Sequence, residues 1–168
     1  MVSAEVSLTS KVGRESYLKR ALSQCPDRWD MVIIDTPPTC SLMTVNALVA
    51  AQTVLIPTQA QALDLDGLQN FRCTIAEVQE MANPRLKIAG IVLTFFEGRF
   101  IEHRNAMQQI IDAKLPLCKT TIGRSVRIAE SSRHCRSITD FAVDNPQAVA
   151  YQALAHELDL IKEGPAHA

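Results

Sequence analysis

Short runs of consecutive apolar residues alternate along this chain with longer stretches in which apolar side chains recur every three or four positions. The clearest run follows Asp30 and closes at Asp35, and Pro37 and Pro38 forbid a helix directly after it. Runs of this length with β-branched residues are typical of strands buried on both faces of a parallel sheet. The pattern predicts four such strands, at 31–35, 53–57, 86–94 and 118–122.

Helical periodicity is strongest between Leu65 and Met81, and Asn83 and Pro84 end it. Further helices are predicted at 13–24, 40–51, 102–114 and 146–162, with an irregular or short helical segment at 124–136 and an irregular lead-in at 1–12. Helices that alternate with strands form right-handed βαβ units. We therefore expect an α/β fold, a parallel sheet flanked by helices in three layers, as a single domain over 1–168.

Composition narrows the class of protein. The chain has 168 residues, of which 47% are apolar and 21% charged, and its net charge is −1, so its overall charge does not point to nucleic acid. It contains no apolar run of the roughly 18 residues that a membrane span needs, so we expect a cytoplasmic protein without a membrane partner. The five cysteines form no C-x-x-C pair, which disfavours a zinc site or a disulfide framework.

Asp35 is the first candidate for chemistry, because it closes the predicted strand 31–35. Ligands of open α/β sheets sit at the carboxyl ends of the strands. A carboxylate held there can hold the water shell of a Mg²⁺ ion beside a nucleotide phosphate. Alternatively, Asp35 caps the turn into the following helix, and the strand alone does not separate these two roles.

A basic segment at 119–136 is the second candidate. It carries five cations and one acid, an excess of four positive charges in a slightly acidic chain; the cations are Lys119, Arg124, Arg127, Arg133 and Arg136. Exposed cations of this kind neutralise phosphates and give DNA binding that depends on salt but not on base sequence. The alternative is a solvated surface on which Arg127 and Glu130 pair at helical spacing.

Several stretches carry a family resemblance, among them 13–24, 53–59, 66–68 and 89–94, and two longer ones are the most specific. Between Trp29 and Ala51 the chain matches the Walker B region of the ParA/MinD group of deviant-Walker P-loop ATPases; the matching residues are Asp30, Asp35, Pro37, Pro38, Leu42, Thr44, Asn46, Ala47, Leu48 and Ala51. Between Thr120 and Ile138 it resembles the segment with which the family closes around adenine; retained there are Thr121, Ile122, Arg124, Val126, Arg127, Glu130, Ser131 and Ile138. Gly123 and Ser132 replace prolines of the family pattern, and Cys135 replaces a glycine.

The resemblance implies a P-loop NTPase-like fold that uses ATP and Mg²⁺ in plasmid or chromosome partition. On this basis Thr94 and Gly123 are expected to bind nucleotide, Asp35 to hold Mg²⁺ through water, and four arginines to bind nonspecific DNA: Arg124, Arg127, Arg133 and Arg136. The expected partners are a centromere-binding protein of the ParB type and a second copy of the chain in a homodimer. Nucleoid association would follow from DNA binding.

One family motif is missing from the 168 residues. The phosphates of ATP are held in this family by a glycine-rich loop with a lysine, whose backbone N–H groups cradle them. Because the sequence contains no such loop, we expect an amino-terminally truncated fold in which 13–162 matches the carboxyl-terminal portion of the family. ATPase activity is left open by the resemblance and is not expected of this chain alone. The alternative function is a non-catalytic protein-interaction module built on the same fold.

Overall fold

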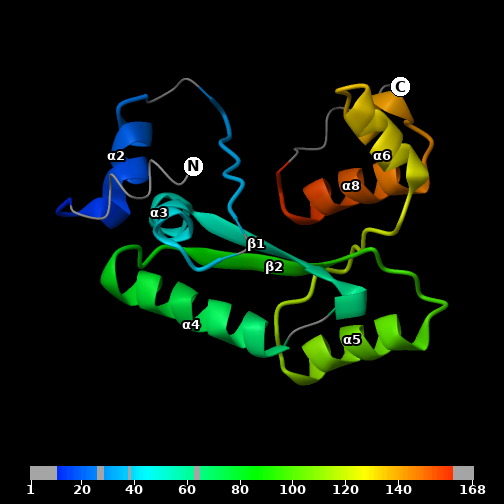
Figure 1. Cartoon of the computed structure of the whole chain (residues 1–168), viewed down its shortest axis with the longest axis horizontal. Helices are drawn as coiled ribbons and strands as arrows, with labels where there is room; N and C mark the ends of the chain where they lie inside the picture. Colours follow the sequence, from blue (N-terminus) through cyan, green and yellow to red (C-terminus); the bar gives the residue numbers. More distant parts are fainter. Residues whose placement is uncertain (1–10, 26–28, 38, 63–64, 161–168) are drawn as a thin grey trace. The chain divides into compact units, whose positions relative to one another are not determined.

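The computed structural model describes residues 11–25, 29–37, 39–62 and 65–160. Its contacts divide the chain into two compact units, Met1–Val54 with Asp64–Ile88 and Leu55–Leu63 with Ala89–Ala168, which are described separately below. A single domain over 1–168 stays a prediction. The elements follow one another along the chain (Figure 1) as η1 (Arg14–Ser16), α2 (Tyr17–Ser23), α3 (Leu42–Ala50), β1 (Thr53–Gln59), η2 (Ala60–Ala62), α4 (Leu65–Met81), β2 (Lys87–Thr94), α5 (Ile101–Asp112), α6 (Val126–Arg133), α7 (Ile138–Phe141) and α8 (Pro146–Glu157).

The strands β1 and β2 lie side by side in a two-stranded sheet (Figure 1), and α4 connects them. Four successive residues of β2, from Gly90 to Leu93, are buried. A strand buried at successive positions has both faces covered, which is the pattern of a parallel sheet between helices. The predicted α/β class, with a parallel sheet flanked by helices, is confirmed.

The segment 116–122 runs parallel to β2 within the second unit. Cys118 N–H donates to Ile91 O at 2.8 Å and Ile122 N–H donates to Leu93 O at 2.8 Å, yet only Ile91 and Leu117 form a β-bridge. Between these bonds, the N–H groups of Lys119 and Thr120 turn instead to the carboxylate of Glu157 in α8. The predicted strand 118–122 is therefore wrong as a regular strand, because a side chain takes the donors that a ladder needs.

The predicted strand 31–35 is also wrong. Within the described residues 29–37 no strand forms, and Ile33 is 83% exposed. Met31 and Val32 are about half exposed as well. An apolar run gains stability as a strand only when neighbours supply hydrogen bonds and cover its faces, and no described strand pairs with this one.

Two buried asparagines tie the first unit together. Asn46 in α3 donates to Arg14 O at 2.8 Å and accepts from Leu18 N–H at 3.2 Å, which fastens η1 and α2 to α3. Asn83, just after α4, donates to Leu48 O and Ala51 O at the end of α3. These two amides hold η1, α2 and the residue that follows α4 at fixed positions against α3.

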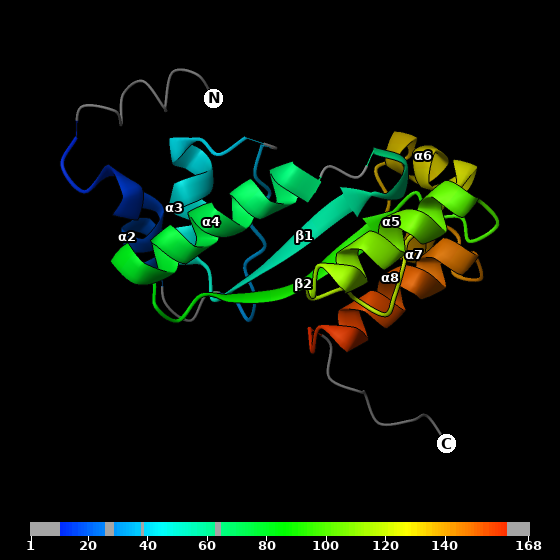
Figure 2. The same ribbon diagram turned by 90° about the horizontal axis from the view of Figure 1, so that it is seen from below.

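The helices agree with the sequence pattern to different degrees. The predicted helix 65–81 matches α4, whereas 13–24 divides into η1 and α2, and 146–162 ends as α8 at Glu157. In the second unit, α6, α7 and α8 gather together (Figure 2), and α7 was not anticipated. Of the irregular lead-in, 1–10 lies outside the described residues, as does Pro38.

Among the described residues, no helix is long and apolar enough to span a membrane.

Candidate functional site

Thr94 and Gly123 lie at adjacent strand exits in the second unit. Thr94 closes β2 and its hydroxyl donates to Thr58 O in β1 at 3.2 Å. Gly123 follows Ile122, whose carbonyl accepts from Phe96 N–H at 3.0 Å, just beyond the end of β2. The carboxyl ends of β1, β2 and the segment 116–122 therefore meet at one edge, where ligands of parallel α/β sheets sit.

The backbone at Gly123 approaches its neighbours closely. Its N–H donates to Gln147 Oε1 in α8 at 2.6 Å. A Cβ at this position would come within 2.9 Å of Gln147 Nε2 and 3.2 Å of Phe96 O. The replacement of the family proline by glycine therefore has a local consequence, because proline has no N–H to donate to Gln147. Gln147 was not among the predicted site residues, and no motif marks it.

A shallow hollow of about 340 Å³ opens beside this edge, lined by Phe95, Arg124, Ser125 and Val126. Arg124 donates to the side chain of Gln61 in η2, and its guanidinium lies 5.5 Å from the centre of the Phe95 ring. Phe95 has a φ of 51°, a left-handed conformation that is uncommon for a bulky residue. Arg124 therefore forms part of the rim of the strand edge.

The remaining arginines of the basic segment lie on or beside α6, and two of them, Arg127 and Arg136, lie near Phe141 of α7. The guanidinium of Arg127 is 4.9 Å and that of Arg136 is 6.0 Å from the centre of the ring. His134 stacks on the same ring at 5.3 Å with an interplanar angle of 19°. Phe141 thus holds three basic side chains near one another, and it was not recognised from the sequence because it lies outside 119–136.

The partners of these arginines differ. Arg127 pairs with Glu130 at 2.8 Å, so the ion pair considered for this segment is confirmed. Arg136 donates to Asp140 O at 2.7 Å. Arg133 is exposed, and its side chain makes no hydrogen bond or ion pair with the described residues. All four arginines remain exposed at the surface of the second unit.

Glu157 holds the start of the basic segment. Its carboxylate accepts from Lys119 N–H at 2.6 Å and Thr120 N–H at 2.9 Å. Desolvation opposes ionisation, but hydrogen bonds from the side chain of Thr120 and from both backbone N–H groups outweigh it and lower the pKa of Glu157. Burial, assisted by the nearby charge of Glu157, raises the pKa of the Cys118 thiol.

Asp35 belongs to the first unit, whereas Thr94 and Gly123 belong to the second. It is exposed within the segment 29–37 and does not close a strand. The described residues contain no cluster of three His, Cys, Asp or Glu side chains that could hold a metal directly. A single carboxylate fits Mg²⁺ only through the ion's own water shell, with phosphates supplying further ligands.

The chain was compared with known proteins by sequence. A family model described as "AAA domain" matches residues 1–88. An uncharacterized protein of Mycobacterium tuberculosis is 39% identical over 156 residues, which cover 92% of this chain and 49% of that protein. The chromosome-partitioning ATPase Soj of Thermus thermophilus is 35% identical over 164 residues, with 94% of this chain and 62% of Soj covered.

A solved structure agrees with these relatives. The cobyrinic acid a,c-diamide synthase of Mycobacterium smegmatis superposes with a TM-score of 0.78 at 32% identity, covering 92% of this chain and 57% of the synthase. The same enzyme has been solved with an ATP analogue and magnesium bound. The chain spans about half to two thirds of the length of these proteins. It belongs to the AAA-domain family and, within that family, to the P-loop ATPases of the ParA/MinD type.

Proposed function

We propose that this chain acts in DNA partition as a ParA-type protein and that its part in this activity is to bind DNA without base specificity. The carrying observation is the group of exposed basic side chains around Phe141, in which the guanidinium groups of Arg127 and Arg136 and the ring of His134 lie against one aromatic ring. An aromatic ring that orients guanidinium groups reduces the entropy lost when these groups bind phosphates. With Arg124 and Arg133 nearby in sequence, the segment can neutralise several phosphates.

Duplex DNA of unrelated sequences should bind with similar affinity, and the logarithm of the affinity should fall linearly with the logarithm of salt concentration. Each neutralised phosphate steepens that slope by about 0.9. Replacing four arginines with alanine should weaken binding equally for all sequences and flatten the slope by up to roughly three, since Arg127 is already paired with Glu130. The four are Arg124, Arg127, Arg133 and Arg136.

A control variant removes the same number of charges elsewhere, with alanine at Lys11, Lys19, Arg99 and Arg104, all of which are exposed. It should keep the salt slope of the unchanged chain. Strong preference for one DNA sequence, or unchanged binding by the variant of the basic segment, would contradict the proposal.

We further propose that Thr94 and Gly123 contact the base side of ATP and that Asp35 orients the water shell of Mg²⁺. The position of Thr94 and Gly123 at the carboxyl ends of parallel strands supports the first role. Bound ATP supplies a triphosphate that coordinates the metal, but the 168 residues contain no lysine-bearing glycine loop to hold it. The chain thus offers candidate residues for the base and for the hydrated metal but no phosphate loop, and this chain alone is proposed not to hydrolyse ATP.

A centromere-binding protein of the ParB type and a second copy of the chain are the proposed partners. Chromosome partitioning is part of the name of the Thermus relative, which supports the first of these. Nucleoid association of a cytoplasmic protein would follow from DNA binding. A second candidate function is a non-catalytic interaction module, and the exposed apolar residues of 29–37 favour it because such surfaces commonly contact other proteins.

A further inference from the structure

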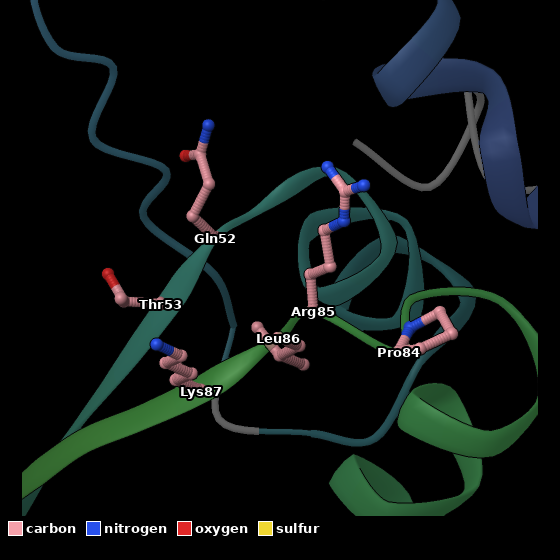
Figure 3. Close-up of a pocket in the computed structure, with 6 residues that line it drawn as sticks. All are labelled: Gln52, Thr53, Pro84, Arg85, Leu86 and Lys87. Carbon is pink, nitrogen blue, oxygen red and sulfur yellow. The ribbon is translucent and has the colours of Figure 1, made fainter.

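A larger hollow lies in the first unit, where β1 and β2 begin (Figure 3). Its volume is about 550 Å³. The residues around it come from the entrance to each strand, and they are Gln52, Thr53, Pro84, Arg85, Leu86 and Lys87. None of them is among the residues proposed above for nucleotide, metal or DNA.

The floor of this hollow is fixed by hydrogen bonds and burial. Lys87 N–H donates to Gln52 O at 3.0 Å, which joins the two strand entrances. Leu86 is 2% exposed, its N–H donates to Asn83 O at 3.1 Å, and its carbonyl accepts from Gln79 in α4 at 2.8 Å. The backbone that carries Arg85 and Lys87 is therefore held on both sides of Leu86.

The rim is polar and positively charged. In Figure 3 the polar ends of Gln52 and Arg85 point upward from the ribbon, and those of Thr53 and Lys87 point to the left. Arg85 and Lys87 are exposed, and neither takes part in an ion pair with the described residues. Among the described residues, no carboxylate lines the hollow. Because no acid among the described residues pairs with either cation, both charges are available to a bound anion.

We propose that this hollow binds a phosphate group. A phosphate brings negative charge and several acceptor oxygens, which suit the planar fork of Arg85, the ammonium of Lys87 and the donors of Gln52 and Thr53. Apolar surface from Pro84 and Leu86 leaves room for an uncharged part of the ligand. The phosphate can belong to a nucleic-acid backbone or to a small phosphorylated molecule, since both present the same group.

Pyrophosphate is the probe for this site. Titrated at constant ionic strength into the ¹⁵N-labelled chain, it should produce saturable shifts of the amide signals of residues 52–53 and 85–87. The double variant Arg85→Gln and Lys87→Gln should weaken the affinity about tenfold or more, because both charge-assisted contacts are lost. A matched control, Lys19→Gln with Arg72→Gln, removes the same charge from positions of α2 and α4 that do not line the hollow and should bind like the unchanged chain.

Duplex DNA added to the pyrophosphate complex identifies the source of the phosphate. If DNA displaces pyrophosphate from both the unchanged chain and the variant that lacks the four arginines of 119–136, the hollow is assigned to nucleic acid. If the pyrophosphate complex persists, the hollow is assigned to small phosphorylated molecules. Either result leaves the site in place even if the basic segment proves not to bind DNA. Shifts that do not saturate, or an equal loss of affinity in the double variant and its control, would overturn the proposal. If the double variant does not fold, Arg85→Gln and Lys87→Gln are tested one at a time.

Discussion

At the scale of residues, a few polar or small residues fix contacts between elements that the pattern of apolar positions does not predict. Asn83 is the clearest case, because one buried amide satisfies two carbonyls at the end of α3. Gly90 is another, because the chain passes it so closely that no side chain fits. Both residues look unremarkable in sequence, and both are open to direct measurement.

Replacing Asn83 with alanine should destabilise the fold by about 1–3 kcal/mol, because the carbonyls of Leu48 and Ala51 lose their donor in a partly buried place. Urea unfolding followed by circular dichroism measures the change. Asn70→Ala at an exposed position of α4 is the control and should change stability little. Equal stabilities of the two variants would contradict the structural role of Asn83.

Replacing Gly90 with alanine should destabilise the fold by about 1–3 kcal/mol, since the new Cβ would lie 2.4 Å from the sulfur of Cys118. Cys118→Ala removes that sulfur, so the double variant should be more stable than the sum of the two single changes predicts. A double-mutant cycle in urea measures this coupling. Strictly additive effects would mean that the two residues do not collide.

At the scale of elements, Glu157 decides whether the segment 116–122 continues as a strand. Its carboxylate draws the N–H groups of Lys119 and Thr120 toward α8, and the ladder to β2 is interrupted there. The same contacts place the beginning of the basic segment against the last turn of α8. A helix end and a strand exit are thus joined by one ionised side chain.

This contact makes stability depend on pH in a defined direction. Because folding lowers the pKa of Glu157 below its ordinary value of 4.5, its contribution is fully present above that value and is lost as pH falls through the lower folded pKa. Glu157→Gln should therefore reduce the urea midpoint at neutral pH and narrow the gap to the unchanged chain in acid. A midpoint difference that stays constant from neutral to acidic pH would argue against the contact.

The sequence pattern predicted an element correctly where the apolar periodicity within that element is enough to identify it. The apolar steps from Leu65 to Met81 gave α4 with its observed bounds. Patterns failed where the outcome depends on distant partners: the run 31–35 reads as a buried strand but finds no described neighbour, and 118–122 loses donors to Glu157. At the candidate site, Arg127 and Glu130 were paired correctly from spacing, whereas Phe141 and Gln147 are brought in by tertiary packing.

At the scale of the whole molecule, exposed apolar surface in 29–37 is the main feature that packing within the chain does not explain. Trp29 is 54% exposed and Ile33 83% exposed. Surfaces of this kind are usually covered by another chain or promote aggregation. The chain is therefore expected to associate with itself or with a partner through this segment.

Sedimentation velocity at concentrations of tens of micromolar, on the order of those at which exposed apolar surfaces associate, should detect species larger than a monomer. Replacing Val32 and Ile33 with lysine should shift the distribution toward monomer by placing like charges on the contact. A control with lysine at Met81 and Val149, which are also exposed, should leave the distribution unchanged. A clean monomer of the unchanged chain would contradict this expectation.

Mg-ATP should bind weakly or not at all to the isolated chain, because Asp35 can orient a hydrated ion but the 168 residues contain no lysine-bearing glycine loop to cradle the triphosphate. Isothermal titration calorimetry decides this. Micromolar affinity together with turnover that disappears in Asp35→Ala would contradict it and would require the chain to hold the phosphates by other residues.

The rate at which the buried thiol of Cys118 is alkylated can measure how often the fold opens locally. Four described cysteines are exposed, at positions 25, 40, 73 and 135, whereas Cys118 is 5% exposed and its pKa is raised by burial. Only a thiolate reacts readily with alkylating reagents, so Cys118 should be modified only during excursions that bring it to solvent. With serine at the other four positions, the rate of alkylation then reports how often β2 and α8 part, without any dye or denaturant.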